Sequence, residues 1–222
     1  MASIVEQIYE DLKKKIINLD IVPGTKLKEE DLAQDYNISR TPIRSVIARL
    51  EKDGLVEVIS KKGTYVSKID SSDMYNLIYI RKSVEMSIFD TLCGKLTNEQ
   101  IDRINSILNE QKEIISLETS IEKSRRFYDN DNKFHETLFE FAELNRAWEI
   151  VSKNATNLNR VRVMANLRDS SHVEGIYDYH VKMIDNLIKG NINEAKRLFA
   201  EHLDGGFEGL NKVRDRYPSY FL

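Results

Sequence analysis

Cysteine, proline and glycine are scarce in this chain of 222 residues, which contains one cysteine, three prolines and nine glycines. Because Cys93 has no second cysteine to pair with, an internal disulfide is excluded, and a reducing compartment is expected. The chain also lacks low-complexity runs and any repeat of fixed period, which excludes a repeat architecture. Hydrophobic residues make up 41% of the sequence, enough for a sizeable core.

Long apolar runs are absent as well. No window has the roughly 18 apolar residues that a membrane helix needs, so we expect no membrane-spanning segment. The first residues, MASIVEQIYEDLKKKI, are amphipathic and charged from the start. They lack the apolar core of a signal peptide. We therefore expect a cytoplasmic protein.

A large charge of one sign is the third absence. The formal net charge is −3, which argues against a wholly basic nucleic-acid binder. The charge is unevenly distributed, because residues 39–62 contain six basic side chains against three acidic ones. Such a cluster is usually a solvated face, so the surrounding pattern must decide its meaning.

The first part of the chain mixes helical and strand-like patterns. Apolar residues recur at helical spacing over residues 4–17, and VPG at 22–24 breaks that helix. Further along we expect a short helix over 28–36, a turn over 37–42, a helix over 43–54 and two short strands around the basic turn KKG. This order of elements is that of a winged helix-turn-helix.

The basic residues of this segment lie where DNA binding would need them. A helix that follows a tight turn presents its N-terminal residues and its dipole to the major groove. The glycine of the KKG turn allows the wing tip to approach a phosphate or the minor groove. The residues expected to bind DNA are Ser39, Arg40, Thr41, Arg44, Arg49, Lys62 and Gly63. The alternative interpretation is a small helical domain with incidental arginines.

After about residue 71 the sequence is almost wholly helical. Six helices are expected, over residues 72–94, 97–117, 120–143, 145–167, 172–189 and 192–215. Thr97 and Gln100 have the spacing of a capping box, and short connections favour an antiparallel bundle. The expected fold is thus mostly α, with a winged helix-turn-helix domain over 1–68, a linker over 69–72 and an all-helical bundle over 73–222.

Two histidines are expected to meet inside the bundle. His180 lies ten residues before Gly190, and His202 lies twelve residues after it. On antiparallel helices both would lie about 15–18 Å from the turn. Both also fall on apolar stripes. Imidazoles that face each other in a core would leave ring nitrogens without partners, and a bound metal ion removes that problem.

The segment FYDNDNKFHETLFEF, residues 127–141, supplies two more candidate ligands. Its apolar stripe carries Asp131 and His135, which a spacing of four places on one helix face. The candidate ligands are then Asp131, His135, His180 and His202, a set that suits Zn, Ni, Co, Mn or Fe. Tetrahedral geometry would close the site, whereas octahedral geometry leaves two open positions. His172 is expected to lie in the polar loop RDSSHVEG and to be an ordinary histidine.

Two arginines also interrupt apolar stripes of the bundle. Arg81 takes the place of a hydrophobe in the helix over 72–94, and Arg162 repeats the theme more weakly. A buried arginine requires an anionic partner. One interpretation is an intramolecular pair, for example of Arg81 with Glu85 or Asp131. The other is bidentate binding of the carboxylate of an effector by these arginines.

Two parts of the sequence resemble known families. Residues 23–66 resemble the DNA-binding domain of the GntR superfamily of bacterial transcription regulators, especially in SRTPIR, RLEKDGLV and KKGTYV. The C-terminal half resembles the FCD effector domain of the FadR-like branch in YIRKSVE, DNKFH and YHVKMIDNLIKGNINEAKRLFAEHL. The resemblance covers nearly the whole chain.

The resemblance implies a homodimer that binds a palindromic operator and releases or rebinds it when a small organic acid occupies the bundle. It implies DNA contacts at Arg40, Thr41, Arg44, Lys62 and Gly63, and metal ligands at Asp131, His135, His180 and His202. It also places Arg81 where some members hold a carboxylate effector. One departure is the acidic run Glu29, Glu30 and Asp31, because some members have a basic residue in that helix.

We therefore expect a bacterial transcription regulator and no enzyme. The winged-helix domain would bind DNA, and a carboxylate effector bound through a divalent metal would change operator affinity. One alternative is a metal-dependent enzyme acting on a small organic acid, although no carboxylate is placed as a general base. Another is a metal sensor, in which the ion is the signal. The effector, the metal, the operator, the role of Arg162 and the direction of regulation are not identified.

Overall fold

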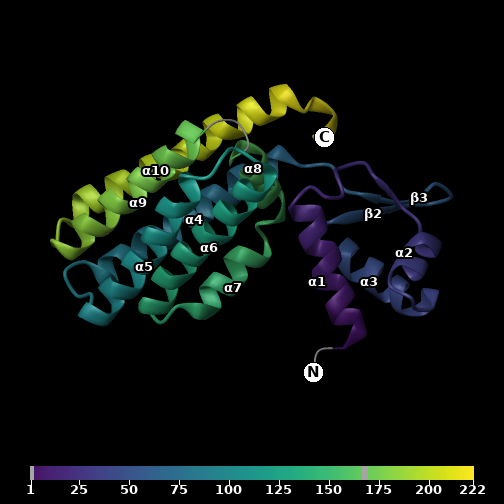
Figure 1. Cartoon of the computed structure of the whole chain (residues 1–222), viewed down its shortest axis with the longest axis horizontal. Helices are drawn as coiled ribbons and strands as arrows, with labels where there is room; N and C mark the ends of the chain where they lie inside the picture. The colour runs from purple at the N-terminus through teal and green to yellow at the C-terminus, as the bar shows by residue number, and fades with distance from the viewer. Residues whose placement is uncertain (1–2, 167–169) are drawn as a thin grey trace. The chain divides into compact units, whose positions relative to one another are not determined.

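The computed structural model describes residues 3–166 and 170–222 (Figure 1). They form two compact units, Met1–Ser71 together with Arg216–Leu222, and Ser72–Asp215. Residues 216–222 therefore belong to the first unit, although the sequence suggested that they continue the bundle. Each unit has its own apolar core.

The first unit is a winged helix-turn-helix. Its elements are α1 (Ile4–Ile17), β1 (Lys26–Leu27), α2 (Glu29–Asp35), α3 (Arg40–Lys52), β2 (Val56–Ile59) and β3 (Gly63–Val66). The strands form one antiparallel sheet in the order β1-β3-β2. The helical and hairpin pattern is confirmed, but α3 begins three residues earlier than expected, and the two-residue strand β1 was not expected.

The core of this unit explains why α3 holds its position. The apolar stripe of α1 packs on α3, whose residues Ile43, Val46 and Leu50 have no exposed surface. Helical spacing places these three side chains on one face. The opposite face of α3 is therefore left to solvent and carries the polar residues of the helix.

The residues after α10 (Ile192–Arg216) complete the first unit. A short 3-10 helix over Pro218–Tyr220 is followed by a parallel bridge between Phe221 and Ile69. The Ile69 amide donates to the Tyr220 carbonyl at 2.8 Å, and the Leu222 amide donates to the Ile69 carbonyl at 3.1 Å. Phe221 is 4% exposed. We call residues 217–222 the C-terminal tail.

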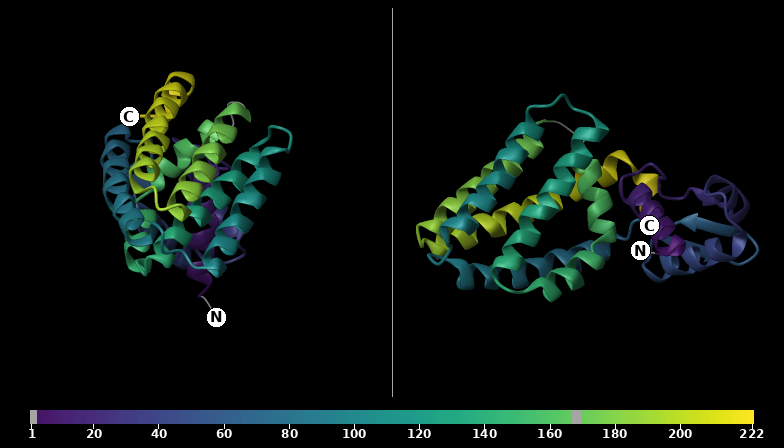
Figure 2. Two further views of the ribbon diagram at one scale, coloured as in Figure 1. Left: turned by 90° about the vertical axis from the view of Figure 1, so that its left-hand side faces the viewer. Right: turned by 60° about the horizontal axis from the view of Figure 1, so that its bottom comes forward.

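The second unit is an all-helical bundle, in which many of the helices run side by side (Figure 2). The described residues form α4 (Ser71–Leu92), α5 (Asn98–Ile115), α6 (Ile121–Phe141), α7 (Asn145–Lys153), α8 (Thr156–Asn166), α9 (Ser170–Ile188) and α10. The helix expected over 145–167 is divided into α7 and α8, and residue 167 lies outside the described residues. The division falls at Asn154, whose amide group donates to the Ile150 carbonyl at 2.6 Å and closes α7.

Helix caps position the long helices of the bundle. The capping box of Thr97 and Gln100 is present at the start of α5. At the other end of α5, the buried Lys123 ammonium donates to the Ile115 and Leu117 carbonyls at 2.6 and 2.8 Å. A cation at the C-terminus of a helix is favoured by the helix dipole.

Among the described residues, no helix combines the length and apolar character that crossing a membrane requires.

Candidate functional site

Four side chains from three helices meet inside the bundle. Asp131 and His135 come from α6, His180 from α9 and His202 from α10. One ligand atom from each lies within 4.8 Å of the others. The His180 and His202 ring centroids are 4.8 Å apart, so the two positions expected to share one height on neighbouring helices do so.

Each of these side chains presents a buried polar atom that has no hydrogen-bond partner. The atoms are Asp131 Oδ1, His135 Nε2, His180 Nε2 and His202 Nδ1. Buried polar groups are normally satisfied, so four polar atoms without hydrogen-bond partners around one point require an explanation. Imidazole nitrogens and a carboxylate oxygen are ligands of divalent transition metals. The residues present therefore fit such an ion.

The other ring nitrogens of two of these histidines are held in place by neighbours. His135 Nδ1 lies 2.6 Å from Glu85 Oε2, and His180 Nδ1 lies 3.0 Å from Gln111 Oε1. Because both acceptors are oxygens, each Nδ1 carries the proton and each Nε2 lone pair faces the cluster. The sequence did not reveal this role of Glu85 and Gln111. Each is a polar residue on the apolar face of its helix, Glu85 on α4 and Gln111 on α5. The same pattern singles out Arg81, so it could have indicated these two residues as well.

The surroundings of the cluster keep two of its histidines neutral and its carboxyl group ionised, as metal ligands must be. Burial lowers the pKa of His180 well below its ordinary value and lowers the pKa of His202 to about 3. Burial would raise the pKa of Asp131, but the Arg162 charge holds this pKa below its ordinary range. The Arg81 charge and the hydrogen bond from His135 similarly outweigh burial and lower the pKa of Glu85 to about 2. At neutral pH both carboxyl groups are ionised, and His180 and His202 are neutral.

The two arginines predicted in the bundle have different surroundings. Arg81 Nε donates to Glu85 Oε1 at 2.7 Å, which is the intramolecular pair considered above. Arg81 is 5% exposed, and its Nη2 has no hydrogen-bond partner. Arg162 Nη2 donates to Asp131 Oδ2, and its Nη1 donates to Asn132 Oδ1 at 2.8 Å. Arg162 therefore holds one oxygen of Asp131 and leaves the other facing the histidines.

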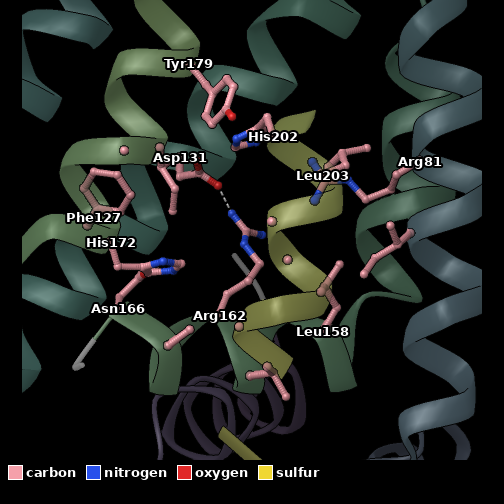
Figure 3. A pocket seen from close by; sticks show the side chains of 18 residues that line it. Arg81, Phe127, Asp131, Leu158, Arg162, Asn166, His172, Tyr179, His202 and Leu203 are labelled. Atoms are coloured by element: carbon pink, nitrogen blue, oxygen red, sulfur yellow. Dashed lines mark hydrogen bonds and ion pairs between the residues drawn. The ribbon is translucent and has the colours of Figure 1, made fainter. Parts of the chain in front are cut away.

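Two members of the cluster, Asp131 and His202, line a partly open cavity of about 260 Å³, to which helices α4, α6, α8, α9 and α10 contribute. Its polar wall includes Arg81, Asp131, Arg162, Tyr179 and His202, which Figure 3 shows around one space. His172 also lines this cavity. It belongs to α9, so the expectation that it lies in a loop is wrong.

The residues predicted to bind DNA occupy two exposed places in the first unit. Ser39, Arg40, Thr41 and Arg44 are exposed at the N-terminus of α3. Arg40 pairs with Glu30 at 2.7 Å, and Arg44 Nε donates to Glu29 Oε2 at 2.8 Å. Ser39 has the extended backbone of an N-cap, but its side chain makes no capping hydrogen bond. The acidic run of α2 thus lies directly beside the arginines of α3.

The wing tip and Arg49 are the remaining positions predicted to bind DNA. Lys62 is exposed, and Gly63 has a φ of +122°, which only glycine adopts readily. A Cβ at Gly63 would lie 2.9 Å from Lys26 Cε.

Arg49 is different from the other predicted residues, because it pairs with Glu6 at 3.0 Å and stacks 3.7 Å above the Tyr9 ring. Arg49 therefore joins α3 to α1.

Together, the fold and the cluster define a winged-helix protein with a helical domain that contains a buried polar cluster beside a cavity. Residues 4–66 match the family "Bacterial regulatory proteins, gntR family", and residues 76–205 match the FCD domain. The chain belongs to the gntR family of regulators that carry an FCD domain. It is a DNA-binding transcription regulator and not an enzyme.

Individual relatives span almost the whole chain. The transcriptional repressor RspR of Escherichia coli K12 is 26% identical over 216 residues, which cover 97% of this chain and 92% of RspR. The regulator YdhC of Bacillus subtilis 168 is 27% identical over 207 residues, with coverages of 93% and 91%. The structure of E. coli McbR/YncC has a TM-score of 0.77 at 15% identity, covering 98% of this chain and all of its own. This last likeness shows that the fold is shared.

Proposed function

We propose that this regulator changes its affinity for operator DNA when a small carboxylic acid binds at a divalent-metal centre in the bundle. The observation that carries the proposal is the convergence of four buried polar atoms without hydrogen-bond partners, beside a cavity that Asp131 and His202 line. The same cavity contains Arg81, whose buried Nη2 has no partner. A divalent ion bound there supplies positive charge and, with more than four ligands, open positions for carboxylate oxygens.

The residues around the cluster have separable roles in this proposal. Asp131, His135, His180 and His202 hold the ion, which is one of Zn, Ni, Co, Mn or Fe. Glu85 and Gln111 fix the tautomers of two of the histidines through the bonds described above. Arg162 orients Asp131, and the Nη2 group of Arg81 binds the acid.

We further infer that the N-terminus of α3 enters the major groove of DNA. Arg40, Thr41 and Arg44 are exposed there, and Lys62 and Gly63 form the wing tip that contacts phosphates or the minor groove. Two copies related by a two-fold axis would bind a palindromic operator in the cytoplasm. The acid then biases this homodimer between two arrangements of its DNA-binding units.

Elemental analysis tests the metal centre. Metal-free protein is incubated with zinc, nickel or manganese, desalted, and its metal content is measured per chain. We expect about one tightly held ion per chain in the wild type and a large loss in His180→Ala, because removal of one ligand opens the site. His172→Ala is the matched control, since it removes a histidine that lines the cavity but lies outside the cluster.

The same proteins test the regulatory role. Operator affinity is measured with and without acetate for the wild type and both variants. We expect the acid response to disappear in His180→Ala and to persist in His172→Ala. Equal metal content in all three proteins would rule out the proposed site, and an acid response that survives metal loss would rule out its role.

A further inference from the structure

The wall of the cavity away from the arginines is built largely from apolar residues and glycines. Ile78, Phe127, Leu158, Val161 and Ala165 line it, together with four glycines. The glycines are Gly175 of α9 and Gly205, Gly206 and Gly209 of α10. Glycine is among the least favourable residues for the interior of a helix. Three of them within five residues of α10 weaken that helix and require a reason.

Close packing between helices is not that reason. A Cβ at Gly175 or Gly205 would have no atom within 4 Å. A Cβ at Gly206 would lie 3.9 Å from Ile78 Cδ1, and one at Gly209 would lie 3.7 Å from Ala165 Cβ. These are ordinary contact distances, so alanine fits at each position. What the glycines provide is open space along the cavity, which a methyl group would reduce.

An independent observation indicates where the charged end of a ligand would lie. Arg81 is 95% buried and lines the cavity, and its Nη2 has no hydrogen-bond partner. Although Arg81 Nε pairs with Glu85, a buried Nη2 group without a partner favours an acceptor such as a carboxylate oxygen. Among the described residues, Asp131 is the one acidic residue that lines the cavity, and Arg162 already pairs with it. Besides these two arginines, no other arginine or lysine of the described residues lines the cavity.

We propose that the effector is a monocarboxylic acid whose unbranched apolar body lies along the glycine-lined wall of α9 and α10. This inference rests on the proposed acid-responsive function and adds the chemical class of the acid. A volume of about 260 Å³ holds roughly nine groups of the size of water, at about 30 Å³ each. The carboxylate takes three of them and leaves about six for carbon atoms. Hexanoate and heptanoate have this size.

Calorimetry with a homologous series tests the inference. The zinc-loaded full chain is titrated with acetate, butyrate, hexanoate and octanoate. The dissociation constant should fall by about fourfold for each added methylene up to hexanoate, because each methylene leaves water. Octanoate should gain little more, since its body exceeds the volume of the cavity.

Two variants locate the apolar body of the acid. Gly175→Ala and Gly206→Ala should each weaken hexanoate binding about tenfold or more and leave acetate binding unchanged within about twofold. Both variants should unfold at the same temperature as the wild type or higher, since alanine fits and favours the helix. Acetate and the unfolding temperature thus serve as internal controls for folding and for the metal centre.

The possible results separate the two proposals. If no acid of the series binds, the proposed acid-responsive function is wrong, and this inference fails with it. If acetate and hexanoate bind equally well, or if the alanine variants weaken both acids to the same extent, the function stands and the glycine-lined site is refuted.

Discussion

At the scale of single residues, the arginines at the N-terminus of α3 are already paired before DNA arrives. Arg44 is held by Glu29 and Arg40 by Glu30, and all four side chains are largely exposed or partly exposed. Exposed ion pairs contribute only about 0–1 kcal/mol. Phosphates and base edges of DNA can therefore compete with Glu29 and Glu30 for these arginines. The negative charges of the two glutamates restrict which arginine–DNA contacts are favourable.

Arg44→Ala should weaken binding to a DNA site selected from a random pool by about 10- to 100-fold. The reason is that a base-contacting arginine contributes about 1–3 kcal/mol. Fluorescence anisotropy at fixed salt measures the change. Arg103→Ala is the matched control, because Arg103 is an exposed arginine paired with Glu140 in the bundle. Equal affinity of wild type and Arg44→Ala would contradict the assignment of α3 as the recognition helix.

A second variant in the same assay examines the role of the Glu29 side chain. Glu29→Gln keeps the side-chain length and removes a negative charge beside Arg44. We expect tighter binding to unrelated DNA and a smaller ratio of specific to nonspecific affinity, because the electrostatic term is independent of sequence. An unchanged ratio would show that Glu29 has no part in selectivity.

At the scale of secondary-structure elements, the wing depends on one backbone conformation. Gly63 begins β3 with a φ of +122°, and Lys26 of β1 lies where a Cβ at this position would project. Gly63 pairs with Ile59 in the register of β2 and β3. The geometry of the wing tip and the attachment of β1 are therefore linked at this glycine.

Gly63→Ala should destabilise the chain by about 1–3 kcal/mol, because a non-glycine residue in this conformation is strained. The wing should also bind DNA less well. Urea denaturation and anisotropy measure the two effects. Ser60→Ala, at an exposed position of the same turn, is the control and should leave both unchanged. Wild-type stability of Gly63→Ala would show that the turn relaxes into another conformation.

The elements themselves were predictable to different extents. The helices α1, α5 and α6 follow from apolar periodicity and from serine or threonine caps, which act within a few residues. The strand β1 could not be foreseen, because it has two residues and exists only through its pairing with β3. The break between α7 and α8 was also missed, since an asparagine inside a helical pattern signals an end only weakly.

At the scale of the whole molecule, the meeting of the aspartate and the three histidines could be anticipated, whereas the residues that support them could not. The distances of His180 and His202 from one turn fix their relative height, so helix geometry alone suggests that they meet. Glu85 and Gln111 lie 50 and 69 positions from the histidines that they hold. No local pattern predicts which helices of a bundle become neighbours, so these contacts required the structure.

The C-terminal tail offers a prediction at this scale. Phe221→Ala removes a buried aromatic ring from the first unit, which should destabilise that unit by up to about 3–5 kcal/mol. Hydrogen exchange should show loss of protection in α1 and α3 while α5 and α6 retain theirs. Leu222→Ala is the control, since Leu222 is 87% exposed. Unchanged protection in Phe221→Ala would mean that the tail does not stabilise the first unit.

The pairing of the tail with Ile69 has a consequence for biosynthesis. The winged-helix unit contains residues from both ends of the described chain, and residues 72–215 are synthesised between them. At about 5–20 residues per second, the ribosome makes Phe221 roughly 8–30 s after Ile69. During this interval the nascent DNA-binding unit lacks one of its buried side chains. The regulator therefore completes its DNA-binding unit only after its helical bundle has been translated.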